Sequence, residues 1–155
     1  MQADEWPWLA RGLTNLRVLK LQNVRLGTNN QWPAALADCT RLTELHLLGK
    51  SAPPLPDGRY LSRLQTISWL SERYGGALPE ALANSSNVRM LVLGVKPGRR
   101  TNYSMLETFP NLKDVLLVCH DNTAAYAHDF LQLKQRFSDI NAHREYVCDG
   151  WHQVL

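Results

Sequence analysis

The pattern Leu-x-x-Leu-x-Leu recurs along this chain at intervals of about 24 residues. A fixed period in this range is typical of stacked repeats, in which one unit cannot bury its apolar side alone and its neighbours complete the core. The period therefore constrains the architecture more than any single residue does. The copies begin at Leu16, Leu42, Leu64, Val88, Leu112 and, in a weaker sixth copy, Phe137.

The end of each copy predicts a short strand. In the first copy Leu19 and Leu21 flank Lys20, and successive side chains of a strand point to opposite faces of its sheet. The two leucines should therefore point inward, and Lys20 should point to solvent. Because the same pattern returns in the later copies, we expect parallel strands that lie side by side in one sheet.

Prolines mark the segments that return the chain from one strand to the next. Pro7, Pro33 and Pro79 each precede the first apolar residue of a copy by the same number of positions. Proline cannot pair inside a sheet, but it suits the first turn of a helix. These segments should be short helices on the face opposite the strands. The proline-rich residues 51–58 of the third copy predict an extended connection instead.

The combined pattern, Leu-Pro-x-x-Leu-x-x-x-x-x-Leu-x-x-Leu-x-Leu, resembles the leucine-rich repeat family over about residues 6–145. The resemblance implies an α/β solenoid, or horseshoe, of about five to six repeats. A parallel sheet would form its concave face, and short helices or turns would form its convex face. We expect a single domain over 1–155. Residues 6–122 would hold repeats one to five, and 123–155 a C-terminal helix, the weak sixth repeat and a capping tail.

A second helical pattern occurs near the end of the chain. Tyr126, Phe130, Leu133 and Phe137 are spaced by four, three and four residues, which places them on one face of a helix. The spacing predicts an amphipathic helix over 124–136. Aromatic side chains in such a stripe indicate core packing rather than contacts to a cofactor.

Composition narrows the class of partner. The chain has 17 basic and 14 acidic residues, a nearly even and scattered charge that does not favour nucleic-acid binding. Its longest apolar run, 115–119, is far shorter than the roughly 20 residues that cross a membrane. Three cysteines without a Cys-x-x-Cys pair indicate buried thiols in a reducing compartment. We expect a protein of the cytoplasm or nucleus that binds neither nucleic acid nor membrane.

The sequence predicts no catalytic, metal or cofactor site. Its histidines lack the His-Glu-x-x-His spacing, and the glycine-rich phosphate-binding patterns do not occur. Cys119, His120 and Asp121 are contiguous, so their side chains cannot converge as a catalytic triad does. Ser68 and His46 are expected to be neighbours on the concave face, but a nucleophile also needs an orienting group and an oxyanion hole. Neither can be recognised in the sequence.

The residues that should point outward from the sheet are unexpectedly apolar. A solvated face would be polar throughout, whereas a contiguous apolar area with a polar rim usually marks an interface. We therefore predict that a partner protein docks on the concave face. Two alternatives are that the bulky residues simply fit one another on the strands, or that a loop or the C-terminal tail covers them. The predicted site is Leu48, Leu70, Met90, Val92, Leu116 and Val118, with His46 and Ser68.

Short phrases resemble two kinds of leucine-rich repeat protein. Residues 39–45 and 109–115 are similar to fungal F-box proteins, which implies substrate recognition for a ubiquitin ligase. Residues 13–19 and 76–82 are equally similar to plant or algal repeat proteins, including immune receptors that sense ligands. The helical F-box or a nucleotide-binding domain would lie upstream. We predict a noncatalytic protein-protein interaction module; the alternatives are a structural or self-associating repeat protein, a ligand-sensing repeat region and, least favoured, an enzyme.

Overall fold

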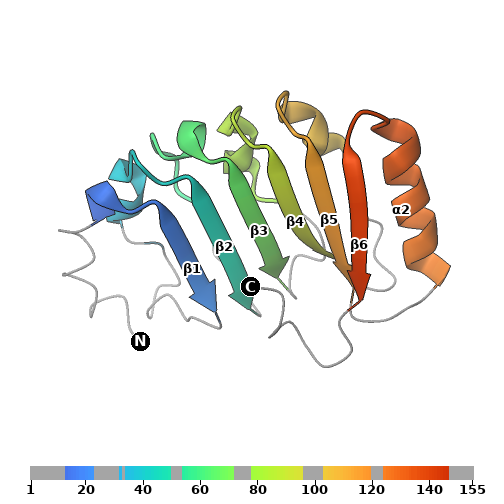
Figure 1. Cartoon of the computed structure of the whole chain (residues 1–155). Coiled ribbons are helices and arrows are strands. Elements are labelled where there is room, and N and C mark those ends of the chain that lie inside the picture. Colours follow the sequence, from blue (N-terminus) through green and yellow to red (C-terminus); the bar gives the residue numbers. More distant parts are fainter. Residues whose placement is uncertain are drawn as a thin grey trace.

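The protein is an α/β structure built on a six-stranded parallel sheet whose strands follow one another in chain order (Figure 1). The computed structural model describes residues 13–22, 32, 34–49, 54–71, 78–95, 103–119 and 124–146. Every neighbouring pair of strands is parallel, as the repeat pattern predicted. The strands are β1 (Val18–Gln22), β2 (Glu44–Gly49), β3 (Thr66–Ser71), β4 (Met90–Val95), β5 (Asp114–Cys119) and β6 (Asn141–Tyr146).

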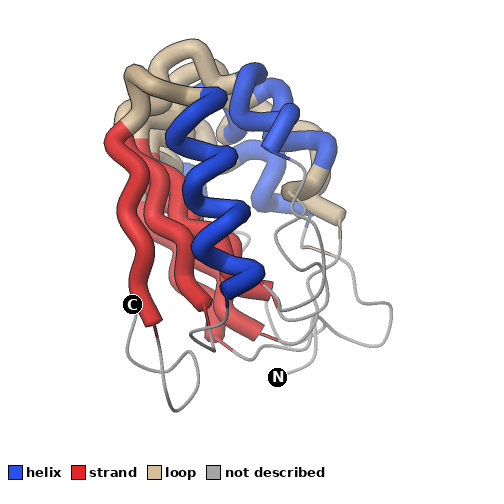
Figure 2. Tube along the Cα trace, turned by 90° about the vertical axis from the view of Figure 1, so that its right-hand side faces the viewer, coloured by secondary structure: helices blue, strands red, loops and turns tan. Residues whose placement is uncertain are grey.

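Helices cover one face of this sheet, so the described part of the chain has two layers (Figure 2). Five of the helices are short 3-10 helices, which suit connections too brief for a regular α-helix. The last is an α-helix. Their bounds are η2 (Leu13–Asn15), η3 (Ala34–Asp38), η4 (Leu61–Arg63), η5 (Glu80–Asn84), η6 (Tyr103–Thr108) and α2 (Ala124–Arg136).

The helices begin where the prolines predicted them. Helix η3 starts at the residue after Pro33, and η5 follows Pro79, whose φ of -59° is already close to a helical value. Residues 54–58 of the third connection contain no helix, in agreement with their proline-rich sequence. The prediction for Pro7 falls outside the described residues.

Helix α2 has the bounds and the apolar face that its spacing predicted. Leu133 is buried, and Phe130 and Phe137 are half-buried against the core. Gln132 and Gln135, on other faces of the helix, are exposed. The side chain of Tyr126 is not among those described. None of the described helices is both long and apolar enough to cross a membrane.

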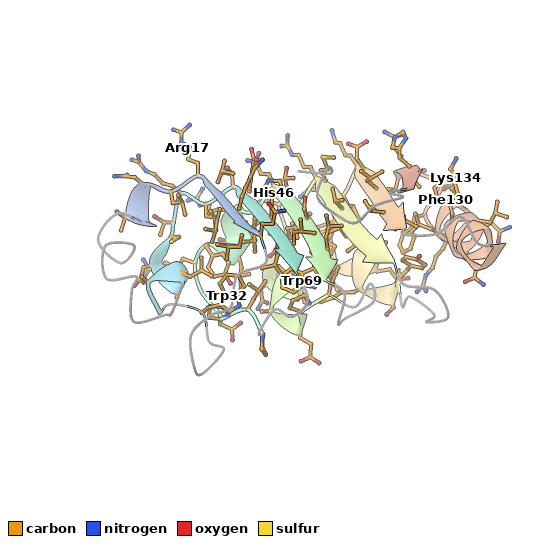
Figure 3. The ribbon with its side chains drawn as sticks, turned by 90° about the horizontal axis from the view of Figure 1, so that it is seen from below. Arg17, Trp32, His46, Trp69, Phe130 and Lys134 are labelled. Atoms are coloured by element: carbon orange, nitrogen blue, oxygen red, sulfur yellow. The ribbon has the colours of Figure 1, made fainter. Side chains whose placement is uncertain are left out.

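The main core fills the space between the sheet and the helices. Alternate strand residues enter it, as the Leu-x-Leu pattern predicted, and leucines of the helices meet them. Trp69 lies on the helix side of the sheet, as does Trp32 (Figure 3). The indole N–H of Trp69 is buried, and no hydrogen-bond acceptor reaches it from the described residues. The fully buried strand residues of this core include Leu45, Ile67, Leu91 and Val115.

Hydrogen bonds join the segments that precede neighbouring strands. The carbonyl of Thr43 accepts from the N–H groups of both Gln65 and Thr66, at 2.8 and 3.1 Å. The side-chain amide of Asn87 donates to the carbonyl of Ser62 at 2.6 Å. These bonds satisfy backbone groups that the turns would otherwise leave unpaired. They also hold the start of each strand in a fixed position relative to its neighbours.

Candidate protein-binding face

The sheet face that points away from the helices, called the outer face below, carries the predicted binding residues. The register places His46 opposite Ser68, Ser68 opposite Val92, and Val92 opposite Leu116. Leu48 lies opposite Leu70 in a second row, nearer the carboxyl ends of the strands. The sequence therefore predicted correctly which residues share this face. It did so because side chains alternate strictly along each strand.

Six of the eight predicted residues are buried rather than exposed, four of them apolar and the other two His46 and Ser68. Leu48, Leu70, Val92 and Val118 form a second apolar cluster, called the outer cluster below, and Leu116 packs against it. Their exposed fractions are 2%, 0%, 6% and 0%. The prediction of an exposed site is wrong for these four residues and for His46 and Ser68. Apolar side chains on neighbouring strands meet and remove one another from water, so the outer cluster acts as a small additional core.

The accessible apolar part of the outer face lies at the beginnings of the strands. Met90 is 39% exposed at the start of β4, and Leu116 on β5 is half-buried. Asp114 stands opposite Met90 on β5, and Thr66 stands opposite it on β3. A partner would therefore meet Met90 and part of Leu116, bordered by polar side chains. Val18, also 39% exposed, lies apart from them on β1.

A hydrogen-bonded chain of three polar side chains lies beside the outer cluster. His46 Nδ1 is 2.8 Å from Ser68 Oγ, and His46 Nε2 is 3.3 Å from Glu44 Oε2. A carboxylate can only accept, so in the neutral imidazole Nε2–H donates to Glu44 and the hydroxyl of Ser68 donates to Nδ1. His46 and Ser68 are buried, whereas Glu44 reaches solvent.

Ser68, His46 and Glu44 are hydrogen-bonded in the serine–histidine–carboxylate order of an activated nucleophile. Ser68, however, is only 2% exposed, so a substrate carbonyl cannot approach its Oγ while the face is packed in this way. What the arrangement does in this structure is link β2 to β3 by a buried side-chain bond. Glu44 was not predicted as the partner of His46. The signal was present, since residues two apart on a strand share a face.

Cys39 shows the environment that was predicted for it. It is fully buried, and its thiol donates to the carbonyl of Ala35 at 3.3 Å. Burial, and secondarily the charge of Asp38, raise the pKa of this thiol above its ordinary value. Cys39 therefore packs as a small apolar residue and stays protonated at neutral pH. The side chain of Cys119, together with His120 and Asp121, falls outside what the structure describes.

Within the described ranges, no group of His, Cys, Asp and Glu side chains gathers in a way that could hold a metal ion. No family model matches this chain, and no curated protein and no solved structure matches it. The likeness to leucine-rich repeats therefore stays a prediction that rests on the sequence pattern.

Proposed function

We propose that this protein is a noncatalytic protein-interaction module, built as a leucine-rich repeat solenoid that binds its partner on the outer face of the sheet. The observation that carries the proposal is the exposure of Met90 on a sheet face that no described helix covers. Contiguous exposed apolar side chains with a polar border are typical of interfaces, and half-buried Leu116 lies diagonally across from Met90 on β5. The consecutive order of the parallel strands, at the period of the repeats, supports the solenoid.

The chemistry around Met90 suits a protein surface as ligand. A methionine side chain is flexible and polarisable, so it adapts to apolar groups of different shape. Asp114 on the next strand and Thr66 on the preceding strand offer hydrogen-bonding groups at the edge of this apolar centre. The outer cluster beneath the same face is packed, which gives the partner a firm surface.

The experiment is a comparison of two exposed apolar residues on the same face. Met90→Glu and Val18→Glu introduce the same charge at sites with the same exposed fraction, 39%. Only Met90 lies in the proposed interface. We expect both variants to fold. In the unmodified chain, a photo-crosslinking side chain at neighbouring Thr66 should capture the partner. The same crosslink should form in Val18→Glu and be lost in Met90→Glu. Equal retention of that partner by both variants would contradict the proposal.

Two more specific functions can be distinguished with the same protein variants. If the partner is a substrate of a ubiquitin ligase, as the F-box-like phrases imply, the ligase adaptor should co-precipitate with the full-length protein. If the outer face mediates self-association, light scattering should show a dimer whose population rises with concentration and that Met90→Glu removes. A monomer at all concentrations contradicts self-association and leaves a different protein as the partner.

A further inference from the structure

The turns that lead into the first four strands enclose a groove of about 670 Å³ whose lining is rich in arginine. Arg17, Arg41, Arg63 and Arg89 each come from a different repeat, in chain order. All four side chains are exposed. Within the described part of the chain, none of them forms an ion pair or a side-chain hydrogen bond. The groove therefore concentrates positive charge that the described residues do not neutralise.

The backbone holds these arginines on a fixed frame. The carbonyl of Arg17 accepts from two N–H groups of the next repeat, at 2.9 and 3.0 Å, and the carbonyl of Arg89 does the same at 2.8 and 3.0 Å. Arg41 and Arg63 directly precede Leu42 and Leu64, which are fully buried. In Figure 3, Arg17 points away from the layer that contains Trp32 and Trp69. The four exposed charges therefore lie on hydrogen-bonded segments at the end of the sheet where its strands begin.

An anion would be favourable in this groove for two reasons. Positive charges placed close together repel one another, and a bound anion relieves that repulsion. A guanidinium group also carries a planar fork of donors that matches a carboxylate or phosphate with two parallel hydrogen bonds. Four such groups in one groove indicate a ligand with several negative charges rather than a single small ion.

The spacing of the arginines favours an extended peptide. Neighbouring strands lie about 4.8 Å apart, so four successive repeats span about 14 Å. An extended chain rises about 3.3 Å per residue, and its alternate side chains share one face. About five residues would therefore span the four strands, and acidic side chains at the first, third and fifth positions would be about 6.6 Å apart. The four arginines occupy two register positions, because Arg17 and Arg89 lie two residues further along their copies than Arg41 and Arg63. Each carboxylate could therefore lie between arginines of neighbouring strands. The remaining lining, which includes Thr43, Gln65 and Asn87, supplies hydroxyl and amide groups suited to a peptide backbone.

The lining argues against single-stranded nucleic acid as the ligand. Such ligands are held by aromatic side chains on which successive bases stack. None of the residues that line the groove is aromatic. The net charge of the whole chain is only +3, so the molecule lacks the strong overall positive field that favours a long nucleic acid. A local row of arginines fits a short acidic segment better than a long polyanion.

We propose that this groove binds an acidic peptide segment in extended conformation, with its alternate carboxylates facing the four arginines. The proposal rests on the proposed function in that the ligand belongs to a partner protein. The groove lies before the strands begin, however, and does not include Met90, so the two surfaces can be tested separately.

The test uses the fluorescein-labelled peptide Gly-Glu-Ser-Glu-Ser-Glu-Gly, with anisotropy as the readout. We expect binding that weakens as salt is added, because the contacts are between exposed charges. The double variant Arg41→Gln, Arg63→Gln should raise the Kd roughly tenfold. The matched control is Arg59→Gln, Lys134→Gln, which removes two exposed charges elsewhere and should leave the Kd nearly unchanged. Circular dichroism should show that both double variants keep the fold.

Four outcomes would overturn the proposal: an equal loss of affinity in the control variant, equal binding of a peptide with Gln in place of Glu, tighter binding of a Gln peptide that carries one phosphoserine, and tighter binding of a short oligothymidylate. The last two would assign the groove to a phosphopeptide or to nucleic acid instead. Met90→Gln, which removes the apolar side chain without adding a charge beside Arg89, should bind the acidic peptide like the unmodified chain. If it does so while losing the partner at the outer face, both proposals stand, and a failure of one leaves the other intact.

Discussion

The imidazole of His46 and the hydroxyl of Ser68 are joined across the β2–β3 pair, with 2.8 Å between Nδ1 and Oγ. Both side chains are buried. A buried polar group without a hydrogen-bond partner keeps an uncompensated free energy of desolvation. The bond between these two groups offsets that desolvation for both of them. The bond lies next to the outer cluster, where it fixes the spacing of two strands beneath the proposed interface.

Removing this hydroxyl should destabilise the fold measurably. Ser68→Ala leaves Nδ1 of His46 without its buried partner, and we expect the free energy of unfolding to fall by about 1–3 kcal/mol in urea titrations followed by circular dichroism. Ser62→Ala is the control, because its hydroxyl is exposed and donates to the carbonyl of Arg59 at 3.0 Å. That change should stay within about 0.5 kcal/mol. Equal effects of the two substitutions would show that the buried bond contributes nothing special.

A charge introduced in the buried outer cluster should affect stability differently from a charge at exposed Met90 on the same face. Leu70→Asp places a carboxylate in a fully buried site, and we expect a loss of more than about 3 kcal/mol in the free energy of unfolding, measured by thermal or chemical denaturation. Met90→Asp, at an exposed position, should change the free energy of unfolding by less than about 1 kcal/mol. If Leu70→Asp folds as stably as the unmodified chain, the outer cluster is open to solvent and the original prediction of an exposed patch is restored.

Gly58 is required by a close approach between two connections. A Cβ at this position would lie 2.6 Å from the Cα and 2.7 Å from the carbonyl oxygen of Ala37. Both are backbone atoms of η3, and the N–H of Arg59 donates to that carbonyl at 3.1 Å. We expect Gly58→Ala to lower the free energy of unfolding by about 1–3 kcal/mol. Ala83→Ser, at an exposed position of η5, is the control and should change it little.

A neutral result for Gly58→Ala would mean that this connection can move away from η3 without loss. Amide hydrogen exchange shows whether the connection has moved away from η3 or has kept its position. If the substitution forces the connection outward, amide hydrogen exchange should become faster at Arg59, whose bond to Ala37 would be lost. Exchange at Gln65, which lies in the next turn, should be unaffected.

Alkaline pH should destabilise the protein through two buried groups. Burial raises the pKa of Cys39 in the folded state, and burial, with the charges of Asp57 and Cys39, raises the pKa of Tyr60. The folded protein therefore holds these protons more tightly than the unfolded chain does. Their stabilising contribution is present at neutral pH and decreases as pH rises past 9.0 and then past 10.0, the ordinary values for the two groups.

The measurement is the free energy of unfolding between neutral pH and about pH 10.5. We expect it to fall over this range, and we expect the fall to be shallower in Cys39→Ala and in Tyr60→Phe. The slope is the readout, because each substitution also changes packing at neutral pH. Tyr60→Phe removes in addition a hydrogen bond of 2.7 Å to the carbonyl of Pro56. A slope identical in all three proteins would exclude both groups as its cause.

The secondary structure followed closely from the sequence. Leu19 and Leu21 flank an outward Lys20 as predicted, and α2 has the predicted bounds. The weaker copy that begins at Phe137 contributes a sixth strand, but the strand starts two residues later than in the other copies, with Asn141 rather than Asp139 opposite Asp114. These predictions succeeded because periods of two and 3.6 residues report directly on strands and helices. They need no knowledge of which segments meet.

The candidate sites were predicted less well. The sequence placed Leu70 and Met90 on one face, but only the packing of neighbouring strands made the first buried and left the second exposed. The arginine groove was missed because its members occupy different repeats. A signal existed: Arg17 and Arg89 directly follow the first apolar residue of a copy, whereas Arg41 and Arg63 directly precede it. An arginine next to the first apolar residue in each of the first four copies was therefore the signal for the groove.

The sequence alone determined the repeat period, the inward leucines, the order of strands and helices, and the fact that the outer face carries apolar side chains. Each of these depends on spacing along the chain, where covalent geometry sets the direction of every side chain. Only the tertiary structure decided that Leu70 is buried, that His46 lies between Ser68 and Glu44, and that four arginines share one groove. Exposure and charge proximity depend on residues distant in sequence, and the pairing of the parallel strands brings those residues together.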